Sequence, residues 1–262
     1  DETVAYKGQH YPLYVNRWTN GCVDPLGHTF IESFSLNRSI PEWIFAVGDA
    51  LLRKCLFMLP LSNTTVVTYS VLRSDDSLEL SLKAFTNYRD YHSLTRAGDW
   101  RMMIAPTKRG VIVNPHETAT PIHLWTTHGT CSPEHEWYYG FELAREQERG
   151  LDFTEDHLHS ATFRAELREG DSVSLVISTE HDHTLSTDEA FRSRLAHETE
   201  LLRLWGKARA RKKIAAPQWI QQLVLAADQF IVKREAGGAS DGNTVIAGYH
   251  WFSDWGRDAL VS

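Results

Sequence analysis

The sequence contains no apolar run near the roughly 18 residues that a membrane-spanning helix needs. Its opening stretch, DETVAYKGQH, has neither an initiator Met nor the apolar core of a secretory signal peptide. Such a start is typical of a trimmed chain or of an internal piece of a longer one. We therefore expect no membrane partner and a cytoplasmic location.

Positive charge is also scarce, with 27 Lys and Arg against 34 Asp and Glu and a net charge of -7. Nucleic-acid partners favour basic surfaces, so we expect none here. The single basic run, KARARKK at 207–213, is interpreted as the solvated end of a helix, where cations suit the helix dipole.

Cysteine is rare as well: Cys22, Cys55 and Cys131 are widely spaced and form no C-x-x-C pair. This pattern argues against a disulfide framework and fits a reducing compartment. Nucleotide-binding and G-x-S-x-G nucleophile motifs are missing, so no cofactor is expected.

Two histidine pairs have the spacing that places both side chains on one strand face. They are His157 with His159 and His181 with His183. Zinc sites use such pairs, but they need further ligands, and no convincing third ligand accompanies either pair. We expect no metal site.

Residues 1–184 have the pattern of a mainly β domain. Apolar residues alternate or cluster with β-branched ones at 64–72, 78–85 and 172–178, and turn residues separate such runs near Ser74, Lys108 and Arg168. The stretch HTFIESFSL, 28–36, alternates and is expected to be half-buried. Many strands without interleaved helices favour a β-sandwich.

The period changes to helical at Ser186, which forms an S-x-x-E capping box with Glu189. We assign 185–215 to a helical linker and 216–262 to the start of a further domain. Pro217 fits the first turn of a second helix, and EAGGASDGN, 235–243, is expected to be a loop. The linker's apolar face consists of Phe191, Leu195, Leu202 and Trp205, and that of the second helix of Trp219, Ile220, Leu223, Val224, Ala227, Phe230 and Ile231.

The last fifteen residues, GYHWFSDWGRDALVS, combine aromatic rings with acids and an arginine. Rings match the flat C–H faces of sugars, while Arg and Asp side chains match pairs of adjacent hydroxyls. Gly256 would let the backbone approach a ligand closely. The alternative is that Trp251 and Trp255 are core residues and that Arg257 pairs with a neighbouring acid. Composition alone leaves both interpretations open.

The ending closely resembles the G-Y-x-W-F-x-D-W-G-R-D signature of bacterial and archaeal glycogen-debranching enzymes, the amylo-α-1,6-glucosidase type. Segments 28–36, 63–72, 87–95 and 137–163 resemble the N-terminal domain of the same family. This resemblance implies a β super-sandwich, linker helices and an (α/α)6 barrel that holds the active site. Its implied substrate-binding residues are Trp251, Asp254, Arg257 and Asp258, with Arg257 and Asp258 holding hydroxyls of the reacting glucose.

The sequence departs from the family pattern in two ways. The family's glycine-rich opening and its R-R-Y-H-G-L segment are not present, which leaves open that the sandwich lacks its first strands. The barrel is expected to be truncated, with only its start in 216–262. Glycoside hydrolysis needs two carboxylates flanking one bond, and Asp254 and Asp258 are too close together near one helix start to be that pair. We therefore expect no catalytic residue in this chain.

The leading hypothesis is the N-terminal part of a glycoside hydrolase that cleaves α-1,6-linked glucose at branch points of glycogen or limit dextrin. Its partner would be an α-glucan, and the chain alone would be inactive. The alternative is a non-catalytic α-glucan-binding β-sandwich module, which needs exposed aromatic rings on a sandwich face.

Two charged groups are given a structural interpretation. Arg89, Asp90 and His92 are interpreted as a strand-end ion pair with a buried histidine, the alternative being a surface that faces the barrel cleft. The second group is expected to form an ion-pair network or to brace a domain interface: Arg145, Glu146, Glu148, Arg149, Asp152, Glu155 and Asp156.

Overall fold

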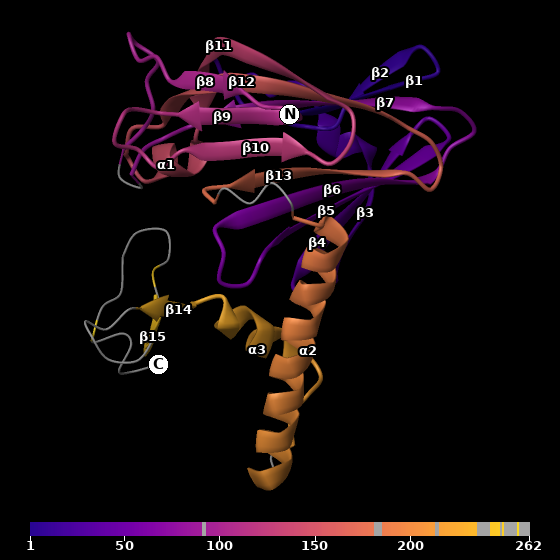
Figure 1. The fold of residues 1–262 in the computed structure, drawn as a ribbon, viewed down its shortest axis with the longest axis vertical. Helices are drawn as coiled ribbons and strands as arrows, with labels where there is room; N and C mark the ends of the chain where they lie inside the picture. Colours follow the sequence, from indigo (N-terminus) through magenta and orange to yellow (C-terminus); the bar gives the residue numbers. More distant parts are fainter. Residues whose placement is uncertain are drawn as a thin grey trace. The chain divides into compact units, whose positions relative to one another are not determined.

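A computed structural model of the chain describes residues 1–90, 93–180, 185–212, 215–234, 242–246, 248 and 256 (Figure 1). The expected mainly β fold is confirmed. The strands are β1 (Glu2–Tyr6), β2 (Gln9–Pro12), β3 (Ile31–Asn37), β4 (Ile40–Val47), β5 (Ala50–Met58), β6 (Thr64–Arg73), β7 (Leu78–Thr86), β8 (Met103–Pro106), β9 (Gly110–Asn114), β10 (Ile122–Thr126), β11 (Thr130–Glu142), β12 (Thr154–Leu167), β13 (Ser172–Ser178), β14 (Ile231–Arg234) and β15 (Gly242–Val245). The helices are η1 (Gly27–Phe30), α1 (Ala144–Glu148), α2 (Thr187–Lys212) and α3 (Ile220–Asp228).

Two large sheets contain most of the strands. One has the order β11-β12-β7-β1-β2, and the other has the order β3-β4-β5-β6-β13-β10-β9-β8. Neighbours such as β7 and β12, or β6 and β13, run antiparallel. The three turns predicted near Ser74, Lys108 and Arg168 are confirmed, since they separate β6 from β7, β8 from β9 and β12 from β13.

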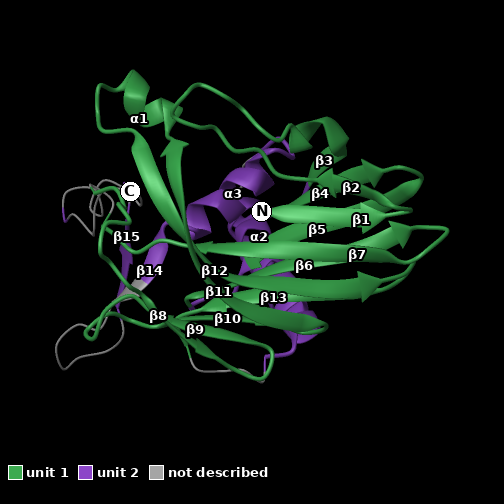
Figure 2. Ribbon diagram, turned by 90° about the horizontal axis from the view of Figure 1, so that it is seen from above, with its two compact units in different colours: residues 1–35, 41–57, 63–184 green, residues 36–40, 58–62, 185–262 purple. Residues whose placement is uncertain are grey.

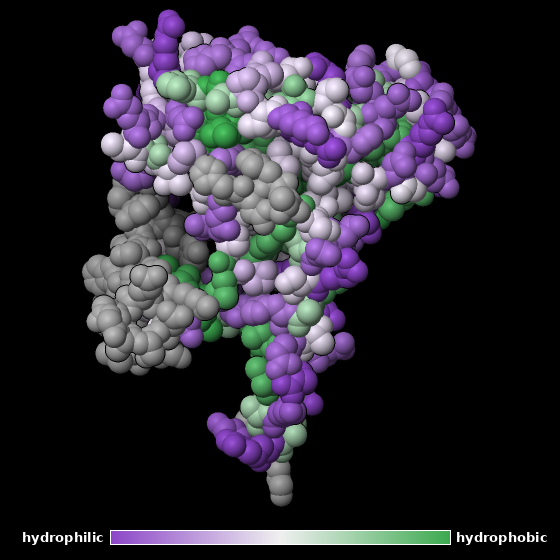
Figure 3. Space-filling view, viewed as in Figure 1, coloured by the Kyte–Doolittle hydropathy of each residue, from purple (hydrophilic) through white to green (hydrophobic). Residues whose placement is uncertain are grey.

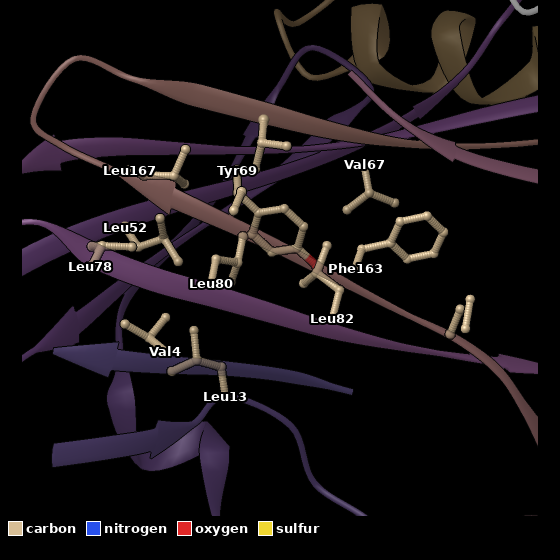
Figure 4. Close-up of a cluster of buried hydrophobic side chains, with 14 of the residues drawn as sticks. Val4, Leu13, Leu52, Val67, Tyr69, Leu78, Leu80, Leu82, Phe163 and Leu167 are labelled. Atoms are coloured by element: carbon tan, nitrogen blue, oxygen red, sulfur yellow. The ribbon is translucent and has the colours of Figure 1, made fainter. Parts of the chain in front are cut away.

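The two sheets share one hydrophobic core (Figure 4). Alternation explains it: along β7, Leu78, Leu80 and Leu82 point inward and are at most 5% exposed, while the intervening residues are more accessible. The opposite sheet contributes Leu52, Val67 and Tyr69 to the same cluster. Fully burying a side chain of this size contributes about 1.5–3 kcal/mol, so the alternation pattern fixes which strand faces point inward.

Strand β3 differs from the prediction. The half-buried alternation expected over 28–36 is wrong for the strand itself, because every residue of Ile31–Asn37 is exposed. Its Phe34 is 57% exposed and Leu36 is 53% exposed. The reason is the position of β3 at the edge of the eight-stranded sheet, a property that alternation along one strand does not reveal.

The chain divides into two compact units (Figure 2). Unit 1 contains residues 1–35, 41–57 and 63–184, and unit 2 contains residues 36–40, 58–62 and 185–262. The helices α2 and α3 and the small sheet of β14 and β15 belong to unit 2. Two turns between strands, 36–40 and 58–62, therefore group with the helices.

Helix α2 begins as predicted. The Ser186 hydroxyl oxygen accepts the backbone N–H of Glu189 at 3.3 Å, and the helix starts at Thr187. Figure 3 shows hydrophobic surface alongside this helix. The four residues of its predicted apolar face, Phe191, Leu195, Leu202 and Trp205, are all partly buried.

The predicted second helix is too long. Helix α3 ends at Asp228, and Ile231 already begins β14, which pairs with β15 from Ile231–Val245 to Arg234–Gly242. Gly242 and Asn243, expected in a loop, belong to β15, and the rest of that predicted loop lies outside the described residues. Strand pairing across the intervening segment overrides the helical period, because each pair satisfies backbone groups that the helix end leaves open.

All three cysteines are free, as their spacing predicts. Burial raises the pKa of the Cys131 thiol to about 11 and also raises the pKa of Cys55. Both thiols are therefore protonated and weakly nucleophilic near neutral pH, whereas Cys22 is exposed.

A helix with the length and apolarity to cross a bilayer is not found in the described part of the chain.

Candidate functional site

The four sugar-binding residues expected from the sequence, Trp251, Asp254, Arg257 and Asp258, lie outside the described residues. Within their segment Gly256 is described, and it is helical and exposed. A Cβ added at Gly256 would meet no atom within 4 Å. Among the described residues no packing contact therefore requires glycine at this position, and the close approach of its backbone to a ligand stays a prediction.

The segment before the motif is held by the small sheet of unit 2. The backbone N–H of Ile246 donates to the carbonyl of Phe230 at 2.8 Å, just beyond the pairing of β14 with β15. Ile246 is 8% exposed and Leu225 of α3 is 2% exposed. Among the described residues, the last hydrogen bond that holds this segment is therefore at Ile246, two residues before Gly248.

A polar cluster joins the turn between β3 and β4 to helix α2. The Arg194 guanidinium donates through Nε to Oε1 of Glu198 at 2.8 Å and through Nη2 to the hydroxyl oxygen of Ser39 at 2.8 Å. The Ser39 hydroxyl in turn donates to Oε1 of Glu198. Glu198 is 1% exposed, so this carboxylate is buried and stabilised by a cation and a hydroxyl.

Helix α3 is attached to α2 and to the same turn by side-chain hydrogen bonds. Gln222 Nε2 donates to the carbonyl of Arg38 at 2.6 Å, and His197 Nε2 lies 2.7 Å from Oδ2 of Asp228. Asp228 is the last residue of α3. The helix that precedes the small sheet is therefore tied down near its start and at its end.

One position in the sequence indicates this cluster, though weakly. Glu198 follows Leu195 by three residues and precedes Leu202 by four, so it sits on the apolar face of α2 where a charge is out of place. That irregularity was the available signal. No such sequence signal marks the other members of the cluster, Arg38, Ser39 and Gln222, because their partners lie 155 or more residues away.

A second buried polar cluster lies in unit 1, where two consecutive acids of β12 hold the segment 87–97. Glu155 accepts from the Arg89 guanidinium and from the backbone N–H of Thr95 at 3.0 Å. Asp156 accepts the backbone N–H of Ala97 at 3.0 Å and that of Gly140 at 3.0 Å. Both acids are buried, at 2% and 8% exposed.

These hydrogen bonds decide the ionisation of Glu155. Burial alone would raise the pKa of its carboxyl, but hydrogen bonds from Arg89 and the Thr95 N–H outweigh burial and hold the pKa below its usual value. Arg89 thus forms the strand-end ion pair that the sequence suggests, although with Glu155 rather than Asp90. Asp90 instead accepts from Ser93, and His92 lies outside the described residues.

The charged residues of 145–156 make contacts in two places. Arg145 pairs with Glu148 and Arg149 with Glu146, both at i,i+3 spacing on the exposed helix α1. Glu155 and Asp156 are instead buried against the 87–97 segment. Exposed pairs of this kind contribute about 0–1 kcal/mol, so the stabilising contacts are concentrated on the two buried acids.

The two histidines of β12, His157 and His159, pack against aromatic rings. His157 lies 4.5 Å from Phe141 between ring centroids, and His159 lies 5.7 Å from Phe85. Asn87 Nδ2 bonds to Nδ1 of His157 at 3.1 Å. No group of three potential metal ligands occurs among the described residues, and His181 and His183 lie outside them.

The two histidines predict a pH dependence of stability. Burial lowers the pKa of both His157 and His159 below the ordinary value of about 6.5. At a pH between the lowered pKa of the folded state and the ordinary pKa of the unfolded state, the unfolded chain binds more protons than the folded chain. The free energy of unfolding therefore falls as the pH drops below about 6.5. We expect a lower Tm at pH 5.5 than at pH 7.0. The drop should shrink in the double variant His157→Gln, His159→Gln and stay unchanged in His10→Gln, a surface control; equal drops in all three proteins would contradict it.

A β-sandwich that binds glucan needs a row of exposed rings, and the described part of unit 1 does not present one. Within 1–90 and 93–180, the exposed Phe, Tyr and Trp side chains are Phe34 and Tyr139, which belong to different sheets. The larger ring cluster around Phe85 and Phe141 packs against itself, largely edge to face. Its ring faces are therefore used within the protein.

Comparison with protein families gives two matches. Residues 1–174 match the family model described as glycogen debranching enzyme N terminal, and residues 225–262 match the one described as amylo-alpha-1,6-glucosidase. The second match spans α3 from Leu225, the small sheet and the whole aromatic ending. A comparison with curated proteins gives no match.

The two matches define a glycosidase-class protein that acts on carbohydrate. The chain belongs to the glycogen debranching enzyme family. Membership implies an α-glucan as substrate.

Proposed function

We propose that the enzyme carrying this chain hydrolyses α-1,6-linked glucose at the branch points of glycogen or limit dextrin. The observation that carries the proposal is the amylo-alpha-1,6-glucosidase match over 225–262, because this range contains every residue expected to touch sugar. It coincides with the part of the sequence richest in rings, acids and arginine, the groups that bind sugars.

The architecture we propose has three parts. Residues 1–184 form the β super-sandwich, with the core shared between the two sheets as its support. Residues 185–215 form the linker, which α2 occupies. Residues 216–262 start an (α/α)6 barrel, and α3 is its first described helix.

Within this architecture, Arg257 and Asp258 hold hydroxyls of the glucose at the cleaved bond, and Trp251 and Asp254 complete this side of the pocket. Each of the two charged side chains can make two directed hydrogen bonds to adjacent hydroxyls. The general acid and base are supplied by other parts of the enzyme, separated as hydrolysis of one glycosidic bond requires. The chain alone then binds sugar without cleaving it.

We also assign the enzyme to the bacterial and archaeal type and to the cytoplasm. The support for the type is the G-Y-x-W-F-x-D-W-G-R-D pattern of the ending. The support for the compartment is three free thiols, which persist where the environment is reducing.

Glucose release tests the proposal. The natural full-length enzyme should release glucose from a branched dextrin that carries single α-1,6-linked glucose stubs, and release little from linear maltoheptaose. The 262-residue chain, as the control, should release none from either. A full-length enzyme that cleaves neither substrate, or a chain of 262 residues that releases glucose, would overturn the assignment.

A further inference from the structure

Arg38 occupies a backbone conformation that arginine rarely adopts. Its φ is +60°, in the left-handed region, at the first position of the two-residue turn between β3 and β4. Glycine is favoured at such positions because it has no Cβ to clash. A bulky residue held there indicates that its side chain serves a purpose.

The contacts of Arg38 supply that purpose. Its guanidinium donates through Nη1 to the carbonyl of Leu195 and to the hydroxyl oxygen of Thr199, both at 2.7 Å. Its own carbonyl accepts the Gln222 side chain at 2.6 Å. One residue thus contacts α2 through its side chain and α3 through its backbone, all within unit 2.

The adjacent cluster fixes the turn that presents Arg38. Ser39, the other turn residue, is bonded to Arg194 and to the buried Glu198. Charge-assisted hydrogen bonds around a buried acid are directional and strong, so they restrict where the turn lies along α2. Arg38 is therefore held opposite Leu195 and Thr199 rather than free to sample solvent.

The held helix leads to the sugar-binding segment. Gln222 lies in the first turn of α3, and the contact between His197 and Asp228 secures its last residue. The carbonyl of Phe230, two residues later, accepts from Ile246, two residues before Gly248. A series of hydrogen bonds and short chain segments thus runs from Arg38 to Ile246, two residues before Gly248.

We propose that Arg38 is a positioning residue for the proposed glucose site: it fixes α3 on α2 and thereby holds the small sheet that precedes Gly248. The proposal rests on the function proposed above. Arg38 acts through α3 and the small sheet and not by contact with sugar.

The sequence offers a matched control for this proposal. Lys7 is also a cation at positive φ, +49°, in the two-residue turn between β1 and β2. Its ammonium pairs with exposed Asp49 in unit 1, 2.7 Å away. Lys7→Gly and Arg38→Gly each replace a cation at positive φ with glycine, but only Arg38→Gly removes side-chain contacts to α2.

In the natural full-length enzyme, Arg38→Gly should lower kcat/KM for glucose release about tenfold with Tm within about 2 °C of wild type. Lys7→Gly should leave kcat/KM unchanged, and Arg38→Lys, which keeps a donor for the Leu195 carbonyl, should recover most of the loss. Equal kinetics for Arg38→Gly and Lys7→Gly would overturn the proposal. A loss of activity that accompanies a Tm decrease of more than about 5 °C would do so as well.

Hydrogen exchange of the 262-residue chain provides a readout independent of activity. Arg38→Gly should speed exchange of the α3 amides at 223–228 at least fivefold while β6 and β13 exchange as in wild type. Unchanged exchange in α3 would refute the positioning role. If the unmodified enzyme released no glucose, the proposed function would fail, whereas faster exchange in α3 would still show that Arg38 holds the helix.

Discussion

Replacing Arg257 or Asp258 with alanine is expected to lower kcat/KM for glucose release by the natural full-length enzyme about 100- to 1,000-fold. Each side chain is proposed to make two hydrogen bonds to hydroxyls of the reacting glucose. A hydrogen bond to a charged group contributes about 1.5–3 kcal/mol, so a pair contributes about 3–6 kcal/mol, and the lower part of that range, about 3–4 kcal/mol, corresponds to the expected loss in rate. Steady-state kinetics on limit dextrin measure the effect.

The matched control for these variants is Ser253→Ala. Ser253 lies within the same segment but at a position that the signature G-Y-x-W-F-x-D-W-G-R-D leaves variable. Its loss should change kcat/KM less than about threefold. If Arg257→Ala and Asp258→Ala behaved like Ser253→Ala, both residues would be excluded from the sugar pocket, and the alternative in which Arg257 pairs with a neighbouring acid would gain support.

The second large effect is on stability. Glu155→Ala in the 262-residue chain should lower the free energy of unfolding by roughly 3 kcal/mol, because it leaves the Arg89 guanidinium and the buried Thr95 N–H without their acceptor. The Arg89 side chain is 30% exposed and partly rehydrates, which keeps the effect below that of a fully buried pair. For a chain of this size the expected Tm decrease is about 6–12 °C.

Glu148→Ala is the control for Glu155→Ala. Glu148 also pairs with an arginine, Arg145, but both side chains are exposed, at 60% and 87%. Its removal should cost less than about 0.5 kcal/mol. Thermal unfolding of the two variants side by side measures the difference, and similar Tm values would show that burial of Glu155 does not determine its contribution.

Patterns that depend on neighbouring residues predicted the fold well. The strand β13 begins and ends where the apolar run SVSLVIS does, and the Ser186 cap marks the start of α2. Alternation and capping are local properties, and the physical cause lies within a few residues of the pattern. The same holds for the turns near Ser74, Lys108 and Arg168.

What could not be predicted depends on distant partners. Strand β3 is exposed because it lies at a sheet edge, and Ile231 is a strand residue because it pairs with Val245. Arg89 bonds to Glu155, 66 residues away, although Asp90 is adjacent in sequence. Sequence spacing does not predict the exposure of β3, the strand conformation of Ile231 or the partner of Arg89, because each depends on the packing of elements that are far apart along the chain.

The aromatic ending and Arg38 differ in the same way in how far the sequence predicts them. The residues proposed to bind glucose, Trp251, Asp254, Arg257 and Asp258, could be predicted because a short, specific string contains them, and that string lies within the range 225–262 that matches the amylo-alpha-1,6-glucosidase model. Arg38 could not be recognised, because its role depends on a positive φ and on contacts with residues more than 150 positions later. A local motif thus predicts the binding chemistry, whereas the contacts that hold the preceding helix are visible only in the structure.

The central claim is that the aromatic ending forms one wall of a glucose pocket. A crystal structure of the natural full-length enzyme with bound glucose tests it most directly. We predict sugar hydroxyl oxygens within about 3.2 Å of the Arg257 guanidinium and the Asp258 carboxylate, with an indole of the segment against the sugar ring. Glucose bound elsewhere, with Arg257 paired to Asp254 or Asp258 and the indoles buried in the core, would contradict the claim.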